Sequence, residues 1–169
     1  MGQQYLPVPR SDFIGIENII HLATGGEPPL LARHRDAFEK FARDKADGMS
    51  GYARHWELIE GVRNKVAGFF NLSIGDIGLI GNASEGIVKV LSSINWHEGD
   101  NVVISELDYT SGRYALGNLK RLGVEVRMVP KTGWYIDTDD LKNACDDKTR
   151  VLYISQVNAT TGQFIDISN

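Results

Sequence analysis

The sequence has a single cysteine, Cys145, in 169 residues. One thiol cannot form a disulfide within the chain, and such sparse cysteine fits a reducing compartment, so a cytoplasmic location is expected. No apolar run reaches the length of a membrane-spanning helix, and no apolar segment accompanies Pro7 and Pro9 near the start. We therefore expect neither a signal peptide nor a membrane partner.

Charge of one sign is not concentrated anywhere in the chain. The 18 Lys and Arg against 22 Asp and Glu give a formal net charge of -4, and the basic residues are scattered. Proteins that bind nucleic acid usually carry a basic patch, so the composition argues against a nucleic-acid partner. The hydrophobic content of 42% is ordinary for a globular protein.

The first part of the chain, residues 1–71, predicts loops and helices without strands. Residues 1–28 are irregular, and glycines and prolines extend this loop to Pro29. Apolar residues at helical spacing predict one helix over 30–46 and another over 55–70. Gly48 and Gly51 are expected to separate these two helices.

The second part, residues 72–169, predicts strands that alternate with helices. Strands are expected over 77–80, 101–105, 124–129 and 150–157, and helices over 84–95, 111–122 and 138–144. Gly123 suits the end of the second of these helices, and Asp137 or Thr138 the start of the third. This order indicates right-handed βαβ units, and hence an α/β fold in three α/β/α layers with a mostly parallel sheet.

A short polar turn, Gly81–Ile87, joins the first predicted strand to its helix. Free backbone N–H groups at a helix N-terminus suit a phosphate. Ser84 or Glu85 is expected to begin the helix, with Ser84 as N-cap. Spacing alone leaves open a phosphate site or a capped turn that binds nothing. The turn lacks the glycine pattern of dinucleotide and nucleotide-triphosphate sites.

Two later strands also end in polar residues. Asp108 and Tyr109 follow the strand over 101–105, and Gln156 and Asn158 end the strand over 150–157. Ligands of open parallel sheets bind at the carboxyl ends of strands, so we expect these residues at one edge of the sheet. Tyr109 is expected either to lie against a planar cofactor or to pack on the domain, and Asp108 either to serve chemistry or to cap a helix.

Taken in order, these segments resemble the class V aminotransferases, fold-type I pyridoxal-phosphate enzymes that include cysteine desulfurases, isopenicillin-N-epimerase-like proteins and kynureninases. Asn82–Gly86 resembles their phosphate turn, and Leu22–Gly26 their N-terminal substrate loop. Val103–Glu106 resembles the strand before the ring-stacking residue, and Val157–Gly162 the V-N-x-x-T-G segment. The resemblance covers nearly the whole chain and implies an incomplete fold-type I large domain.

The resemblance implies pyridoxal 5'-phosphate as cofactor and an amino acid as substrate. Ala83 and Ser84 would hold the phosphate through backbone N–H groups and the hydroxyl, with Glu85 in the same turn. Tyr109 would stack on the cofactor ring, where the family often has a histidine. Asn158, or in its place Gln156, would lie near the ring hydroxyl or the substrate.

The family's Schiff-base lysine and the aspartate that pairs with the pyridinium nitrogen come from later strands than this sequence reaches. We therefore expect the N-terminal portion of an enzyme that acts through a Schiff base, inactive alone and homodimeric at full length. No catalytic residue and no metal ligand is assigned in this sequence. Residues 1–71 would form the substrate and dimer side, and 72–169 the cofactor side. Met49–His55 would face the active site of the dimer partner or simply connect two helices.

Two other functions are considered. A non-catalytic, truncated paralogue would bind a longer partner through the helices over 30–70. A Rossmann-like nucleotide binder would use the Gly81 turn, although the dinucleotide glycine pattern is missing. The family's sheet has more strands than the four expected here, so an uncovered edge and apolar face predict self-association.

Overall fold

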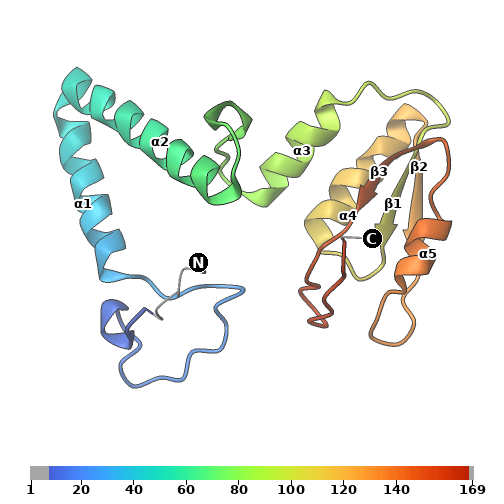
Figure 1. The fold of residues 1–169 in the computed structure, drawn as a ribbon, viewed down its shortest axis with the longest axis horizontal. Coiled ribbons are helices and arrows are strands. Elements are labelled where there is room, and N and C mark those ends of the chain that lie inside the picture. The colour runs from blue at the N-terminus through green and yellow to red at the C-terminus, as the bar shows by residue number, and fades with distance from the viewer. Residues whose placement is uncertain (1–7, 168–169) are drawn as a thin grey trace. The chain divides into compact units, whose positions relative to one another are not determined.

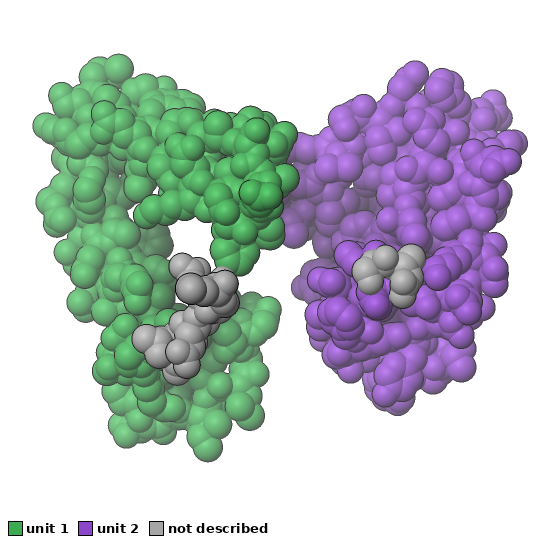
Figure 2. Space-filling view, viewed as in Figure 1, with its two compact units in different colours: residues 1–79 green, residues 80–169 purple. Residues whose placement is uncertain are grey.

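The computed structural model describes residues 8–167, and the chain divides into two compact units, residues 1–79 and 80–169 (Figures 1 and 2). The beginning of the predicted irregular segment, residues 1–7, and the end of the second predicted domain, residues 168–169, lie outside the described residues. The assignment of residues 1–71 to a substrate and dimer side, and of residues 72–169 to a cofactor side, stays a prediction.

Two long helices make up most of unit 1. Its elements are η1 (Arg10–Asp12), α1 (Ala32–Ala46), α2 (Gly48–Phe70) and η2 (Ile74–Asp76). The prediction that Met49–His55 is a loop is wrong, because α2 already begins at Gly48. Gly48 has a φ of 61°, which lets the chain turn sharply at Asp47 and re-enter a helix at once. Gly51 therefore lies inside α2 and does not break it.

A buried carboxylate joins the two helices of unit 1. Asp44 of α1 accepts hydrogen bonds from Lys40 at 2.6 Å and from Arg54 of α2 at 2.8 Å. Lys40 and then Arg54 hold the pKa of Asp44 below its usual range. Gly51 packs on the Asp44 backbone so closely that a Cβ atom would lie 1.6 Å from the carbonyl oxygen. The charged contacts of Asp44 and the absence of a side chain at Gly51 together determine how closely α1 and α2 pack.

Unit 2 holds a parallel sheet. Its elements are α3 (Ala83–Ser93), β1 (Asn101–Ser105), α4 (Thr110–Gly117), η3 (Asn118–Leu122), β2 (Glu125–Val129), α5 (Thr138–Asn143) and β3 (Thr149–Tyr153). The strand order is β2-β1-β3, and both pairings are parallel. Every residue of the central strand β1 is buried. The predicted α/β fold is confirmed.

Helices cover both faces of this sheet. Val102 and Ile104 pack on one face in a cluster completed by Leu91, Leu116, Leu119 and Val124. Val103 points to the other face, where its cluster is completed by Val129, Ile136 and Leu141. Successive strand residues face opposite sides, so α3, α4 and η3 form one outer layer and α5 the other. The three α/β/α layers are as predicted.

Three local predictions need correction. Residues 77–80 form no strand, because no strand among the described residues pairs with them. The helix expected over 111–122 is divided into α4 and η3, and it ends as predicted at Gly123, whose φ is 75°. The last strand ends at Tyr153, four residues earlier than expected, because the Ser155 N–H bonds a side chain instead of a strand.

The part of the chain spanning residues 8–167 contains no helix with both the length and the apolar character needed to cross a bilayer.

Candidate functional site

The N-terminus of α3 is closed by its own side chains. Asn82 is the N-cap, and its Oδ1 accepts from the Glu85 N–H at 2.9 Å. The Glu85 Oε2 reaches back to the Gly81 N–H at 2.8 Å. The prediction of Ser84 as N-cap is therefore wrong, because the helix begins one residue before it at Ala83.

This capping leaves a set of donors free. Among residues 8–167, the backbone N–H groups of Ala83 and Ser84 and the Ser84 hydroxyl have no hydrogen-bond acceptor, and both residues are exposed. The positive end of the helix dipole lies at the same place. The Gly81 N–H, and then Lys89, hold the pKa of Glu85 below its usual range, so this carboxylate stays ionised and already engaged. The arrangement suits a small anion.

The segment between β1 and α4 is held by two polar side chains. The Ser105 Oγ accepts from the Leu107 N–H at 2.9 Å. Asp108, only 5% exposed, accepts from the Ser155 N–H at 2.9 Å through its Oδ1. Asp108 is therefore not a helix cap. The N-cap position of α4 is Tyr109, whose side chain makes no capping bond.

Tyr109 presents an open ring. Its exposed fraction is 60%, so most of the residue is open to solvent and less than half of it packs on the domain. It lines a hollow of about 360 Å³ whose wall includes Arg113, Thr160 and the ion pair of Lys131 with Glu106 at 2.8 Å. Lys131 holds the pKa of Glu106 below its usual range. Stacking of Tyr109 on a cofactor stays a prediction.

Asn158 is 6% exposed and tied into the protein. Its Nδ2 donates to the Leu107 carbonyl oxygen at 2.7 Å, and its Oδ1 accepts from the N–H groups of Thr160 and Thr161, both at 2.9 Å. Gln156, by contrast, is exposed. The side chain of Asn158 thus holds two loops together, and its predicted contact with a cofactor is untested.

The structure brings together the polar ends of β1 and β3. Asn158 bonds Leu107, Asp108 bonds Ser155, and Tyr109 lies in the same hollow as Thr160. The residues at the start of α3 do not line this hollow. Sequence reasoning missed the clamping role of Asp108, since its partner lies 47 residues along the chain.

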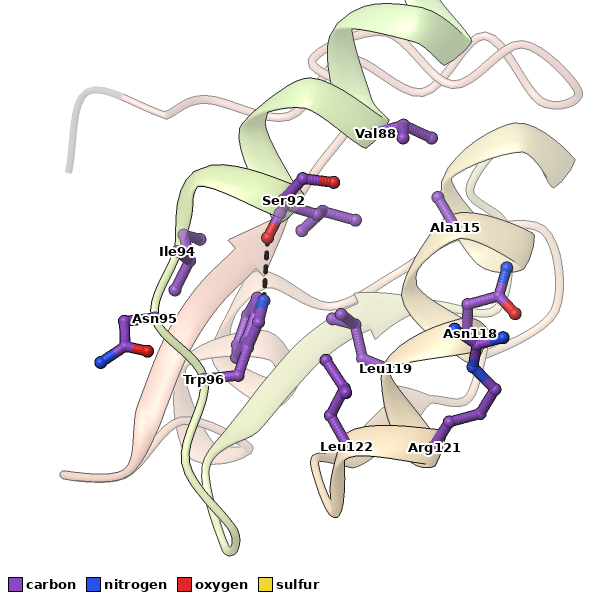
Figure 3. Close-up of a pocket in the computed structure, with 11 residues that line it drawn as sticks. Val88, Ser92, Ile94, Asn95, Trp96, Ala115, Asn118, Leu119, Arg121 and Leu122 are labelled. Carbon is purple, nitrogen blue, oxygen red and sulfur yellow. Dashed lines mark hydrogen bonds between the residues drawn. The ribbon is translucent and has the colours of Figure 1, made fainter.

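A larger hollow, of about 570 Å³, lies between α3 and the α4–η3 segment (Figure 3). Trp96 lines this hollow, and its Nε1 donates to the Leu91 carbonyl oxygen at 2.8 Å. The side chains of Leu119 and Leu122 extend from η3 toward the Trp96 ring. None of the predicted site residues lines it. The predicted site therefore lies elsewhere in unit 2.

Comparison with known protein families identifies a match over most of the chain. The family described as aminotransferase class V matches residues 28–169. A probable cysteine desulfurase of Methanothermobacter thermautotrophicus is 30% identical over 141 residues, which is 82% of this chain and 35% of that protein. A histidinol-phosphate aminotransferase of Halalkalibacterium halodurans is 26% identical over 156 residues, 90% of this chain and 39% of that protein.

Solved structures show the same fold. A C-DES mutant with glycine covalently linked to the PLP cofactor superimposes with a TM-score of 0.85 at 22% identity, over 94% of this chain and 43% of that one. The complex of the cystine C–S lyase C-DES with its product cysteine persulfide gives 0.79 at 23% identity, over 90% of this chain and 42% of that one. This chain spans less than half the length of each of these relatives and solved structures.

Proposed function

The chain belongs to the class V aminotransferase family, and from that premise we propose that it forms the phosphate-binding and ring-binding part of a pyridoxal-phosphate-dependent enzyme acting on an amino acid. The relatives named above carry out different reactions by their names: desulfuration, transamination and C–S lysis. The proposal therefore names the cofactor and the substrate class, and leaves open which bond is broken.

The observation that carries the proposal is the set of free donors at the start of α3. A phosphate needs several hydrogen-bond donors in one place, and Ala83 and Ser84 offer two backbone N–H groups and a hydroxyl. Asn82 and Glu85 satisfy the neighbouring N–H groups and leave these three exposed to a ligand. The donor set fits the phosphate of pyridoxal phosphate.

Two further residues would contact the cofactor ring. Tyr109 offers an exposed aromatic face beside the carboxyl end of β1, which suits stacking on a planar ring. The Oδ1 of Asn158 is already engaged, and one of its two Nδ2 hydrogens is used by Leu107. The remaining hydrogen is the group that would donate to an oxygen of the ring.

When bound, pyridoxal phosphate supplies an electron sink for bonds at the α-carbon of an amino acid. The residues of this chain would bind and orient it: Ser84 holds the phosphate and Tyr109 fixes the ring plane. We propose that the isolated chain performs no turnover, because the resemblance places the family's Schiff-base lysine in strands that residues 1–169 do not include. We also propose that the full-length protein is a homodimer and that it is located in the cytoplasm.

Titration with pyridoxal phosphate, followed by absorbance, tests the proposal. Ser84→Ala is expected to weaken binding roughly tenfold, the effect of one hydrogen bond to a charged group. Ser92→Ala, an exposed serine near the other end of α3, is the matched control and should bind as the wild type does.

Three results would count against it. If Ser84→Ala binds pyridoxal phosphate with wild-type affinity, the phosphate does not bind at the start of α3. Absence of cofactor binding by the wild type, together with co-purification of a longer homologue, would favour the non-catalytic binding partner. Sulfide release from cysteine by the isolated chain with pyridoxal phosphate would contradict the proposed inactivity.

A further inference from the structure

Asp108 is a buried carboxylate for which the proposed function gives no role. It is 5% exposed, and no Lys, Arg or His among residues 8–167 lies within ion-pair distance of it. Burying an aspartate without a cation is costly unless hydrogen bonds compensate. Its Oδ1 accepts one from the Ser155 N–H at 2.9 Å. The carboxylate of Asp108 is therefore held in the interior by a hydrogen bond to the backbone and not by a cation.

The bond joins the residue before Tyr109 to the segment that follows β3. A second hydrogen bond joins the same two segments, because Asn158 donates to the carbonyl oxygen of Leu107. The Asp108 N–H in turn donates to the Ser105 carbonyl oxygen at 3.2 Å. The backbone leading into Tyr109 is thus fixed at each of the two residues that precede it.

The residues after Tyr109 are fixed as well. The Gly112 and Arg113 N–H groups donate to the Tyr109 carbonyl oxygen at 3.1 and 3.3 Å. Gly112 lies flat on Tyr153, the last residue of β3, and a Cβ atom there would come within 2.5 Å of the ring. The start of α4 is therefore seated on the end of β3, which leaves Tyr109 little freedom.

We infer that Asp108 is a positioning residue for Tyr109: its buried carboxylate locks the start of α4 to the segment after β3 and so fixes where the open Tyr109 ring lies. The inference rests on the proposed function, in which Tyr109 stacks on the cofactor. A ring held in place before the cofactor arrives loses less conformational entropy on binding.

The Asp108 carboxylate also affects the pKa of Tyr153 on β3. Burial raises the pKa of Tyr153, and the negative charge of Asp108 raises it further. Removing that charge while keeping the shape should lower the pKa of Tyr153. This gives an independent check on where the carboxylate lies.

The test compares Asp108→Ala with Asp108→Asn in the cofactor-free chain. Amide hydrogen exchange of Gly112 and Arg113, measured by NMR, reports how firmly Tyr109 is held. Asp108→Ala is expected to speed exchange about tenfold, whereas Asp108→Asn keeps an oxygen acceptor and restores protection. Asp137→Ala, which removes the cap of α5, is the control and should leave these two amides unchanged.

Equal exchange in Asp108→Ala and wild type, or exchange in Asp108→Asn as fast as in Asp108→Ala, would overturn the inference. Should Asp108→Ala fail to fold, titration of the Tyr153 ring by NMR in Asp108→Asn decides. A lowered pKa supports the placement of the carboxylate, and an unchanged pKa refutes it.

A spectroscopic measurement with pyridoxal phosphate separates this inference from the proposed function. The visible circular dichroism of bound cofactor should fall in Asp108→Ala, and its affinity should fall less than in Ser84→Ala, since Ser84 still holds the phosphate. If the wild type binds no cofactor, the proposed function fails, and the exchange data still decide whether Asp108 fixes Tyr109.

Discussion

At the scale of single residues, the chain uses polar side chains that accept or donate several hydrogen bonds to hold its segments together. Asp146 is one example outside the candidate site: it accepts hydrogen bonds from the Asn101 Nδ2 and Arg127 Nη1 groups, both at 2.7 Å. It also accepts from the Lys148 N–H at 2.9 Å. Asn101 is fully buried at the start of β1, so the carboxylate secures the entry into all three strands.

Asp146 should make stability depend on pH. The Asn101 amide, followed by Arg127, holds its pKa far below the ordinary value of 3.8. The folded state then favours the ionised form, so this stabilisation is full above the unfolded-state pKa and is lost as the pH falls below it. Asp146→Asn is expected to lower the urea midpoint at pH 7 and to differ less from wild type near pH 2.

The neighbouring exposed residue supplies the control for that measurement. Asp147→Asn makes the same change of charge one position along the chain and should leave the midpoint unaltered at both pH values. A pH-independent loss in Asp146→Asn would show that the hydrogen bonds matter and the charge does not.

At the scale of elements, the α1–α2 pair shows what a small residue permits. Gly51 sits in α2 against the backbone of Asp44, and the adjacent Arg54 bonds Asp44 and Asp47 on the same side. The helices approach closely because Gly51 has no side chain, and the ion pairs form because they approach. Sequence patterns treat this glycine as a helix breaker, since a glycine inside a helix is ordinarily unfavourable.

Replacing Gly51 should separate the two helices. Gly51→Ala places a methyl group within the van der Waals radius of the Asp44 carbonyl oxygen, and we expect a loss of at least about 2 kcal/mol in unfolding free energy. Gly61→Ala, in the same helix with open space around its Cα, should instead stabilise by up to about 1 kcal/mol. Thermal denaturation followed by circular dichroism distinguishes the two, and equal effects would refute the packing argument.

At the scale of the whole molecule, much apolar surface stays exposed. Phe38 of α1 and Phe69 of α2 are 68% and 69% exposed. In the described sheet β2 and β3 each pair only with β1, so each has one edge without a partner strand. Such surfaces and edges are usually covered by other chain segments or by another molecule.

We therefore expect the chain to self-associate. Sedimentation velocity should show species heavier than the 18.7 kDa monomer at micromolar concentration. Phe38→Glu should shift the distribution toward monomer, because a charge on the exposed face of α1 disfavours contact, whereas Glu39→Gln beside it should not. A monomeric wild type with one cooperative unfolding transition would contradict the expectation.

The sequence by itself determined the order of strands and helices in unit 2, the three layers and the end of η3 at Gly123. It narrowed the N-cap of α5 to Asp137 or Thr138, and the structure has Asp137 there. These features follow from periodicity and local turn chemistry, which act over a few residues. The motifs also indicated the family. The sequence did not determine which residue caps α3, because Asn82 and Ser84 both suit that role.

Only the tertiary structure decided what depends on contacts between distant segments. Residues 77–80 look like a strand, yet a strand exists only where a neighbour pairs with it. Asp108 and Asn158 look like ligands for a substrate or cofactor, and their bonds to Ser155 and Leu107 bridge 47 and 51 positions of the chain. Local pattern cannot carry such information, because the partner of a buried polar group is set by how the elements pack.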